Sequence, residues 1–301
     1  MKKGLRLGVD IGGTLVKLAV VDERGLVLKR AQTDALKNPK SLVEAVHEEI
    51  SDWGEKNFLG TGVAVAGDVD PVRGVVRFST NLGWTNVPLV DLFRRCGFPK
   101  PFHFENDATA AAWGANHLEC GGRARNLVVV TLGTGVGAGL IFDGKIYRGA
   151  TGTAGELGHT PVGGEGVACL CGSRDCLEAY MGGAALMTWA TNAYTQKRRS
   201  KIPVSPKELA LAARRGDAVA KEAWIRGGRA LGTALASLLN LLNPDTILLA
   251  GGLAKSADLF LPTARKVMME RAFHTPARVV RVRVAKNSED LGVVGAALLV
   301  E

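Results

Sequence analysis

The most constraining feature of the sequence is a pattern that occurs twice: an apolar strand, a glycine turn and a second apolar strand. The first copy covers residues 5–21 and turns at Gly12-Gly13-Thr14, and the second covers 127–142 and turns at Gly133-Thr134-Gly135. The two turns lie about 120 residues apart along the chain, too far for a short-period repeat array. No linker longer than a turn is rich in Pro or Ser. The pattern therefore predicts an α/β fold of two related halves that pack around a cleft.

Helix and strand signals fill in the rest of each half. Asn38 before Pro39, and Ser205 three residues before Glu208, are typical helix starts. We expect strands after each glycine turn and a further strand at 279–285 near the end of the chain. The expected domains are residues 1–118, joined by a C-terminal helix at 290–301, and residues 119–289.

Composition excludes several classes of protein. With 47% hydrophobic and 22% charged residues among 301, the chain can bury a substantial core, which argues against a disordered or fibrous protein. The net charge of +9 raises the question of nucleic acid. However, the basic runs at 123–125 and 197–201 lack interleaved aromatic residues, so we expect solvated loops and no nucleic-acid partner.

Nothing in the sequence predicts membrane insertion or secretion. The longest uncharged stretch, residues 127–142, is too short to cross a bilayer and is interrupted by glycines. The N-terminal residues Met1-Lys2-Lys3-Gly4 lead into an alternating strand that includes Asp10, without the apolar region of a signal peptide. We expect a cytoplasmic protein without a membrane partner.

Glycine turns that follow strands let backbone N–H groups approach an anion closely, because no Cβ intervenes. Each turn alone is better explained as a hairpin in which glycine only supplies a positive φ. Together, the hydroxyls of Thr14 and Thr134, with Asp10 and Lys17 beside the first turn, favour phosphate binding.

Two common nucleotide motifs match this region only by accident. Gly133 to Ala138 has the G-x-G-x-x-G/A spacing of dinucleotide-binding proteins, but a strand follows where a helix is required. Gly139 to Lys145 has the G-x-x-x-x-G-K spacing of a phosphate loop, but Ile146 stands where Ser or Thr is required. We therefore expect neither an NAD site nor a P-loop.

A carboxylate stands where a strand meets a helix. Asp107, in Glu105-Asn106-Asp107, follows the short strand 102–104 and precedes the helical segment 108–117. The simplest interpretation is a helix N-cap. A second is a general base, which phosphoryl transfer to a hydroxyl requires. Asp10, at the end of the first strand, is either a polar strand end or a carboxylate that holds Mg²⁺ through water.

Three of the five cysteines are clustered with a histidine. His159, Cys169, Cys171 and Cys176 have the spacing His-x9-Cys-x-Cys-x4-Cys. Three thiolates and an imidazole complete a tetrahedral zinc shell without an open position, so the predicted site is structural. The zinc-binding loop is expected at 159–176, whereas Cys96 and Cys120 stand alone as ordinary thiols.

Several of these segments resemble the ROK family of sugar kinases in the actin and hexokinase superfamily. The resemblance rests on residues 10–17 and 132–137, similar to the two phosphate motifs, and on Asn243-Pro244 with 247–252, similar to the adenosine-side motif. Residues 155–159 and 169–178 are similar to the signature of the zinc-containing members, except that Asp175 replaces a usual glycine. The resemblance implies an ATP-dependent kinase with a duplicated ribonuclease-H-like fold.

The resemblance also implies roles for individual residues. Asp107 is implied as the catalytic base. The implied sugar-binding residues are Gly67, Thr80, Asn81, Asn106, Asp107, Glu156, His159 and Glu178. The residues implied to hold ATP and Mg²⁺ are Asp10, Gly12, Gly13, Thr14, Lys17, Gly133, Thr134, Gly135, Gly251 and Gly252. The expected partners are a hexose and ATP, and we expect a homodimer or a higher homo-oligomer.

The substrate stays open at this point. Glucose is the first choice because the segments at 155–159 and 169–178 look most like those of ROK glucokinases. Kinases for N-acetylmannosamine, N-acetylglucosamine, fructose and allose share nearly the same motifs. The family also contains sugar-sensing repressors with a helix-turn-helix before the first phosphate motif. Only nine residues precede Asp10 here, so we expect a kinase.

Overall fold

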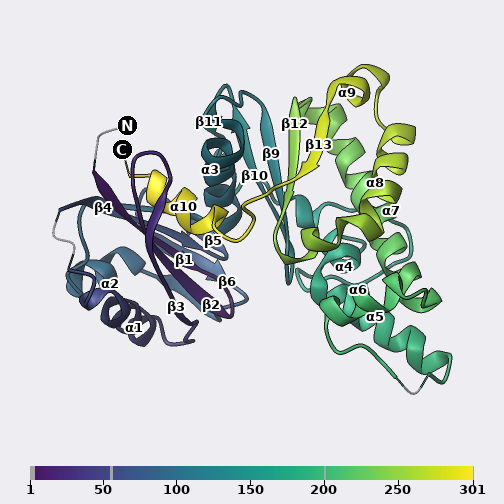
Figure 1. Cartoon of the computed structure of the whole chain (residues 1–301), viewed down its shortest axis with the longest axis horizontal. Helices are drawn as coiled ribbons and strands as arrows, with labels where there is room; N and C mark the ends of the chain where they lie inside the picture. The colour runs from purple at the N-terminus through teal and green to yellow at the C-terminus, as the bar shows by residue number, and fades with distance from the viewer. Residues whose placement is uncertain (1–3, 55–56, 200, 301) are drawn as a thin grey trace. The chain divides into compact units, whose positions relative to one another are not determined.

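The first glycine turn joins two antiparallel strands, β1 (Leu5–Ile11) and β2 (Leu15–Val21), as the sequence predicts. They are seen in a computed structural model that describes residues 4–54, 57–199 and 201–300 (Figure 1). The third strand, β3 (Val27–Asp34), is antiparallel to β2 and pairs with it as far as Asp34. Its residues alternate between half-buried and exposed, typical of an edge strand with one solvated face.

The remaining strands of this sheet run parallel to β1. The order is β3-β2-β1-β4-β8, with β4 at Phe58–Val65 and β8 at Phe102–Asn106. Asp10 on β1 and Glu105 on β8 both align with Ala64 of β4. The carboxyl ends of parallel strands meet at one edge, which is where α/β sheets bind ligands. Asp10 and the Glu105-Asn106-Asp107 segment therefore lie at the same edge of one sheet.

A small antiparallel sheet, which the sequence analysis did not predict, extends this half. It consists of β5 (Asp68–Asp70), β6 (Val75–Ser79) and β7 (Trp84–Val87). The Trp84 side chain is only 2% exposed, and its indole N–H donates to the carbonyl of Lys37 at 2.7 Å. Trp84 is thus a packing residue. Helices α1 (Pro39–Ser51) and α2 (Leu89–Arg95) belong to the same half.

Glycines bring the helices α3 (Asp107–Cys120) and α10 (Leu291–Leu298) close to each other and α10 close to the sheet. A Cβ at Gly62 of β4 would lie 1.8 Å from the carbonyl oxygen of Ala296 in α10. A Cβ at Gly295 would lie 1.8 Å from the carbonyl oxygen of Ala110 in α3. Neither position tolerates a side chain, so the C-terminal helix packs tightly onto the N-terminal sheet.

The second sheet repeats the strand order of the first. Its order is β11-β10-β9-β12-β13, with the strands at Leu127–Leu132 (β9), Val136–Phe142 (β10), Lys145–Ile146 (β11), Thr246–Ala250 (β12) and Arg281–Val284 (β13). The last of these is shorter than the strand expected at 279–285, because Val279 ends a short helix, α9 (His274–Val279). The matching orders confirm the predicted duplication.

Two units emerge from the contacts within the chain. One comprises Met1–Val129, Gly139–Gly155 and Lys286–Glu301, and the other comprises Val130–Ala138 and Glu156–Ala285. The first unit thus includes 119–129 and 139–155, which the sequence analysis assigned to the second domain. The chain passes from the first unit to the second between Gly155 and Glu156.

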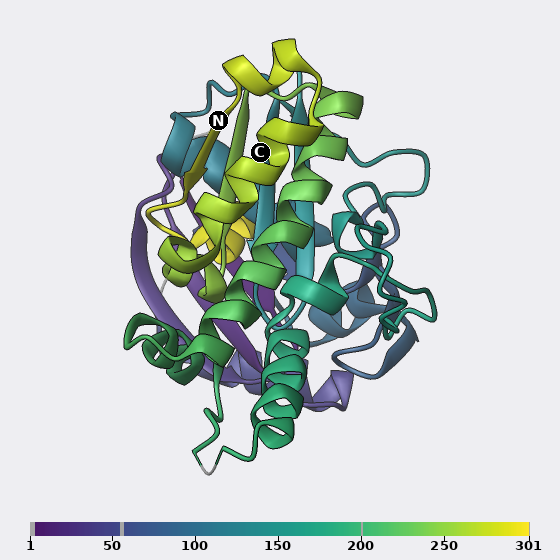
Figure 2. The same cartoon turned by 90° about the vertical axis from the view of Figure 1, so that its right-hand side faces the viewer.

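The second unit contributes most of the helices. They are α4 (Glu178–Met181), α5 (Gly183–Gln196), α6 (Pro206–Arg214), α7 (Ala218–Leu242), α8 (Ala257–Arg271) and the short 3-10 turns η1 (Leu157–His159) and η2 (Gly252–Ser256). Figure 2 shows α7 and α8 side by side, where Gly228 and Gly232 of α7 approach backbone carbonyls of α8. Among the described residues, none of the helices has the length and apolar character needed to cross a bilayer.

Candidate active site

The first glycine turn is closed by its own backbone. The N–H of Gly12 donates to the carbonyl of Leu15 at 3.0 Å. A Cβ at Gly13 would lie 2.7 Å from the Cβ of Asn81, so Asn81 packs directly on the turn. The structure thus brings together Gly13, predicted to bind phosphate, and Asn81, predicted to bind sugar. Thr14 between the strands is exposed.

Asp10 and Lys17 face each other across β1 and β2. Burial raises the pKa of the Asp10 carboxyl to about 6, and the positive charge of Lys17 opposes that shift. The Lys17 ammonium donates to the carbonyl of Glu289 at 2.7 Å. A Cβ at Gly292 would lie 2.4 Å from an oxygen of Asp10, so only glycine leaves room for this carboxylate. A hard oxygen donor at the sheet edge fits a hydrated Mg²⁺ ion.

The second glycine turn rests on the start of α5. The carbonyl of Gly133 accepts a hydrogen bond from the N–H of Gly183 at 2.9 Å. A Cβ at Gly251 would lie 2.4 Å from the carbonyl oxygen of Leu132, immediately before the turn. Gly251, whose φ is +89°, therefore lies beside the second turn. The structure brings together the predicted phosphate turn and the predicted adenosine-side glycines.

Glu178 binds this turn directly. The N–H of Val136 donates to Glu178 Oε2 at 2.8 Å. A Cβ at Gly135 would lie 2.2 Å from the same oxygen. Sequence analysis assigned Glu178 to the sugar, and it gave no indication of this contact. A carboxylate thus occupies one backbone donor of the turn.

Asn106 begins α3 and holds Asp107. Its Oδ1 accepts the N–H of Thr109 at 3.1 Å, so Asn106, and not Asp107, is the N-cap. The interpretation of Asp107 as a cap is therefore wrong: it stands at the first helical position. Its Oδ1 accepts hydrogen bonds from Asn106 Nδ2 at 3.1 Å and from the N–H of Ala108 at 2.9 Å. These two donors fix the orientation of the carboxylate.

The other substrate residues predicted in the first unit surround Asn106 or the first turn. The carbonyl of Gly67 accepts the second amide hydrogen of Asn106, at 3.0 Å from Nδ2. Gly67 has a φ of +143°, and a Cβ there would lie 2.5 Å from the carbonyl oxygen of Phe78. Thr80 and Asn81 form the turn between β6 and β7. A direct contact between Asn106 and a sugar stays a prediction, because both its amide hydrogens already have acceptors.

The His-Cys cluster comes together as the sequence predicts. The donor atoms of His159, Cys169, Cys171 and Cys176 all lie within 4.8 Å of one another. Cys171 Sγ lies 3.7 Å from Cys176 Sγ, and Cys169 Sγ lies 3.8 Å from His159 Nδ1. In a tetrahedral shell with zinc–sulfur bonds of about 2.3 Å, neighbouring sulfurs lie about 3.8 Å apart. The donor set therefore fits zinc in chemistry and in spacing.

Burial of Cys176 makes its thiolate form dependent on a bound cation. It raises the pKa of the Cys176 thiol to about 12, so this sulfur becomes a thiolate at neutral pH only when a cation binds it. His159 turns Nδ1 toward the sulfurs, and its Nε2 lies 3.9 Å from Glu156 Oε2. A metal on Nδ1 would keep the proton on Nε2, on the side of Glu156.

Asp175, which replaces the usual glycine, fits the backbone of the loop and adds hydrogen bonds to it. Its φ is +58°, a left-handed conformation that Asp tolerates better than most residues. Its carboxylate accepts the N–H groups of Gly166 and Val167 at 3.1 and 2.8 Å and the hydroxyl of Tyr180 at 2.5 Å. These bonds tie the two ends of the loop together independently of a metal.

Glu105 and Arg148 form an ion pair that sequence reasoning missed. Glu105 is 1% exposed, and its Oε2 accepts Arg148 Nε at 2.6 Å. The other oxygen, Oε1, accepts the N–H of Asn106 at 3.1 Å. The two residues lie 43 positions apart, and no motif or period connects them. The only signal is a charged residue that directly follows Phe104 in a short strand.

Comparison with known proteins places this arrangement in a family. The profile of the ROK family matches residues 6–301. The glucokinase of Streptomyces coelicolor is 34% identical over 308 residues, which cover 98% of this chain and 96% of that protein. The glucokinase of Thermotoga maritima is 33% identical over 316 residues, which cover 100% and 98%.

A solved structure is also similar over nearly the whole length. It is a ROK family glucokinase from Streptomyces griseus in complex with glucose and AMPPNP, with a TM-score of 0.86 and 33% sequence identity. The similarity covers 98% of this chain and 99% of that one. The duplicated sheets, the two glycine turns and the full-length profile match together show that the chain belongs to the ROK family.

Proposed function

We propose that this chain is an ATP-dependent hexose kinase that transfers the γ-phosphoryl group of ATP to the terminal 6-hydroxyl of glucose. The observation that carries the proposal is Asp107, whose carboxylate is oriented by Asn106 and Ala108 at the sheet edge that also bears Asp10. The full-length similarity to glucokinases, including one solved with glucose and AMPPNP, supports the substrates.

In the proposed reaction, Asp107 accepts the proton of the sugar hydroxyl as its oxygen attacks the γ-phosphorus. The bond from the γ-phosphorus to the bridging oxygen of ADP breaks, and ADP leaves. The N–H groups of Gly12 and Gly133 close the two turns, and the backbone N–H groups of Gly13, Thr14, Thr134 and Gly135, with Lys17, are proposed to bind the phosphates. Gly251 and Gly252 lie on the adenosine side. Asp10 would hold a hydrated Mg²⁺ ion, which would supply positive charge to the phosphates.

We propose that the sugar binds Gly67, Thr80, Asn81, Asn106, Glu156, His159 and Glu178. Zinc bound by His159, Cys169, Cys171 and Cys176 would stabilise the loop. With four protein ligands it would have no open coordination position for a substrate. His159 then donates from Nε2 to a sugar hydroxyl, and Glu156 accepts from another. These residues position the hexose so that its terminal hydroxyl faces Asp107.

The test is a coupled assay of ADP formation across a sugar panel with Mg·ATP as donor. The panel contains glucose, N-acetylmannosamine, N-acetylglucosamine, fructose and allose, and polyphosphate and ADP replace ATP in parallel reactions. We expect the highest kcat/KM with glucose and ATP. Turnover of another sugar at higher kcat/KM would replace glucose, and no turnover with any sugar would contradict the kinase assignment.

Two finer properties are part of the proposal. We propose that the protein acts in the cytoplasm, where a reducing environment keeps the three thiols available to zinc. We also propose a homodimer or a higher homo-oligomer, which light scattering of the purified protein tests directly. A monomer at all accessible concentrations would contradict the second property without affecting the kinase assignment.

A further inference from the structure

An ion pair between the buried Glu105 and the partly exposed Arg148 lies two residues before the proposed catalytic residue. Glu105 is 1% exposed, and burial raises the pKa of its carboxyl, whereas Arg148 and the N–H of Asn106 oppose that shift. Both oxygens have partners within the first unit: Arg148 Nε at 2.6 Å and the N–H of Asn106 at 3.1 Å. A buried charge is costly unless it is paired, so a carboxylate kept here requires an explanation beyond packing.

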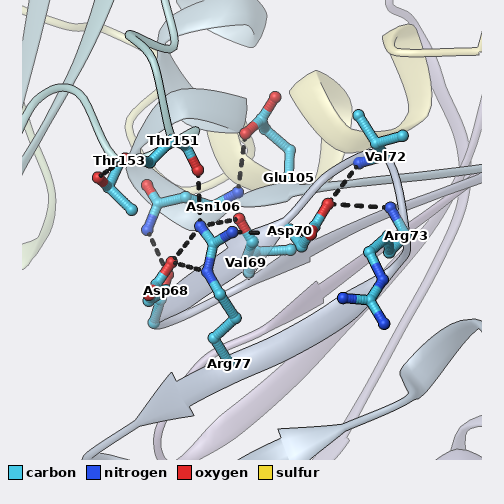
Figure 3. A network of polar contacts seen from close by, with 11 residues as sticks. Asp68, Val69, Asp70, Val72, Arg73, Arg77, Glu105, Asn106, Thr151 and Thr153 are labelled. Atoms are coloured by element: carbon cyan, nitrogen blue, oxygen red, sulfur yellow. Dashed lines mark hydrogen bonds and ion pairs between the residues drawn. The ribbon is translucent and has the colours of Figure 1, made fainter.

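The pair acts on Asp107 through Asn106. Glu105 Oε1 holds the backbone N–H of Asn106, whose side chain donates to the carbonyl of Gly67 at 3.0 Å and to Asp107 Oδ1 at 3.1 Å. The Asn106 Oδ1 caps α3 at Thr109. Figure 3 shows the Glu105 carboxylate next to the backbone N–H of Asn106. Since both ends of the Asn106 amide are engaged, any shift of its backbone moves the donor that orients Asp107.

Arg148 is itself held by an anchored loop. Its carbonyl accepts the N–H of Ala154 at 3.1 Å, which closes the segment 148–154. Arg77 ties the same segment to the small sheet: its Nη2 donates to the carbonyl of Thr151 at 2.8 Å and to Asp68 at 2.6 Å (Figure 3). Gly152, with a φ of +89°, packs on Pro71. The Arg148 guanidinium is therefore presented to Glu105 from a fixed support.

We propose that Glu105 and Arg148 are positioning residues for Asp107, an inference that rests on the proposed function. Neither residue contacts a substrate in this account. Their role is to fix the Asn106 backbone so that the amide holds the Asp107 carboxylate in the orientation required for proton acceptance. Misplacing a catalytic group by about 1 Å costs on the order of 100-fold in rate. Loss of the pair should therefore lower kcat while the KM values of both substrates change little.

The experiment compares kcat and KM of the full-length wild type with those of Arg148→Met, Arg148→Lys, Glu105→Gln and the double variant Glu105→Gln/Arg148→Met. Methionine keeps most of the volume of arginine without its charge, whereas lysine returns a cation to Glu105. The matched control is Arg77→Met, which cuts the other tie of the same loop and leaves the bonds of Glu105 intact. Circular dichroism and thermal unfolding measure the folded fraction of each variant.

We expect Arg148→Met to lower kcat on the order of 10- to 100-fold at nearly unchanged KM. Arg148→Lys should recover part of the loss. Arg77→Met should lower kcat much less than Arg148→Met does, because it loosens the support of Arg148 but leaves the bonds of Glu105 in place. The double variant should lose no more than the larger single loss, because the two residues act as one unit. It also avoids leaving one charge buried alone, so it keeps the test valid where a single variant fails to fold.

Three results would overturn the inference. They are an unchanged kcat in a folded Arg148→Met or double variant, an equal loss in Arg77→Met, and additive losses in the double variant. Failure of the proposed function has a different signature, since the wild type would then phosphorylate no sugar at all. An active wild type with an insensitive Arg148 rejects only the positioning role.

Discussion

The backbone N–H of Val136 donates to Glu178 Oε2 at 2.8 Å, which places a carboxylate on the second glycine turn. Glu178 comes two residues after the predicted zinc ligand Cys176. Gly158, just before His159, also packs on Val136, whose carbonyl oxygen would lie 2.0 Å from a Cβ at position 158. The residues that flank the predicted zinc-binding loop on both sides therefore contact Val136, which directly follows the turn.

This relationship predicts different outcomes at two glycines of one turn. Gly135→Ala would place a Cβ 2.2 Å from Glu178 Oε2 and displace that carboxylate, whereas a Cβ at Gly133 meets no atom within 4 Å. We expect Gly135→Ala to lower the free energy of unfolding by about 1–3 kcal/mol, the usual cost of overpacking, and Gly133→Ala to lower it much less. Thermal and urea unfolding measure both. Equal losses in the two variants would contradict the packing argument.

Metal removal gives a second prediction. As purified, the protein should carry one zinc per chain, and a chelator should release it. Because zinc protects the thiols that bind it, Cys169, Cys171 and Cys176 should react with a thiol reagent only after chelation, while Cys96 and Cys120 react at the same rate before and after. Elemental analysis and timed thiol titration make the measurement. Full reactivity of the three clustered thiols in the untreated protein would count against the site.

Asp175 tests how the loop is held. Asp175→Gly removes the energetic cost of the left-handed conformation at this position. It also removes the carboxylate that accepts hydrogen bonds from Gly166, Val167 and Tyr180. We expect zinc to dissociate faster from Asp175→Gly than from the wild type, and Asp175→Asn, which keeps one acceptor oxygen, to lie between them. Zinc transfer to a chromogenic chelator gives the rates. Slower dissociation from the glycine variant would show that backbone strain outweighs these bonds.

The sequence predicted those parts of the molecule that depend on neighbouring residues. Asn38 caps α1 by accepting the N–H of Ser41, as its position before Pro39 indicates, and both glycine turns join the strands expected. The His-Cys cluster was also visible, since its ligands lie within a short span. Glu105 and Arg148 were not, because their contact joins residues 43 positions apart without a period.

Competition between two adjacent capping residues explains the error at Asp107. Asp107 and Asn106 are both good capping residues. Which of them caps the helix depends on where β8 ends, and the strand pairing with β4 decides that position.

The sheet of β5, β6 and β7 was missed because its strands are short and two of them carry few apolar residues. Such strands form only through their tertiary partners, so propensity alone does not reveal them.

Asp10 gives a pH prediction for the protein in buffer without Mg²⁺. Its pKa rises from 3.8 to about 6 in the folded state through burial, against the opposing charge of Lys17. Between these values the unfolded state has lost this proton and the folded state retains it, so the contribution of Asp10 to stability falls as pH rises. Urea unfolding from pH 4 to 7 should show that Asp10→Asn gains stability relative to the wild type across this window.

The control for this prediction is Asp143→Asn, at a carboxylate whose side chain is 79% exposed. This variant shows how the loss of an exposed carboxylate affects stability over the same range. A stability difference between Asp10→Asn and the wild type that does not change with pH would contradict the prediction.

The central claim is that Asp107 accepts the proton of the sugar hydroxyl, and Asp107→Asn tests it most directly. The amide keeps the shape of the side chain and one acceptor for Asn106 and Ala108, but it cannot act as a base. Steady-state kinetics with glucose and Mg·ATP, together with calorimetric titration of glucose, separate chemistry from binding. We predict that turnover is lost, by at least the 100-fold typical of a general base, while glucose still binds. An Asp107→Asn protein that turns over at a near-normal rate would contradict the account.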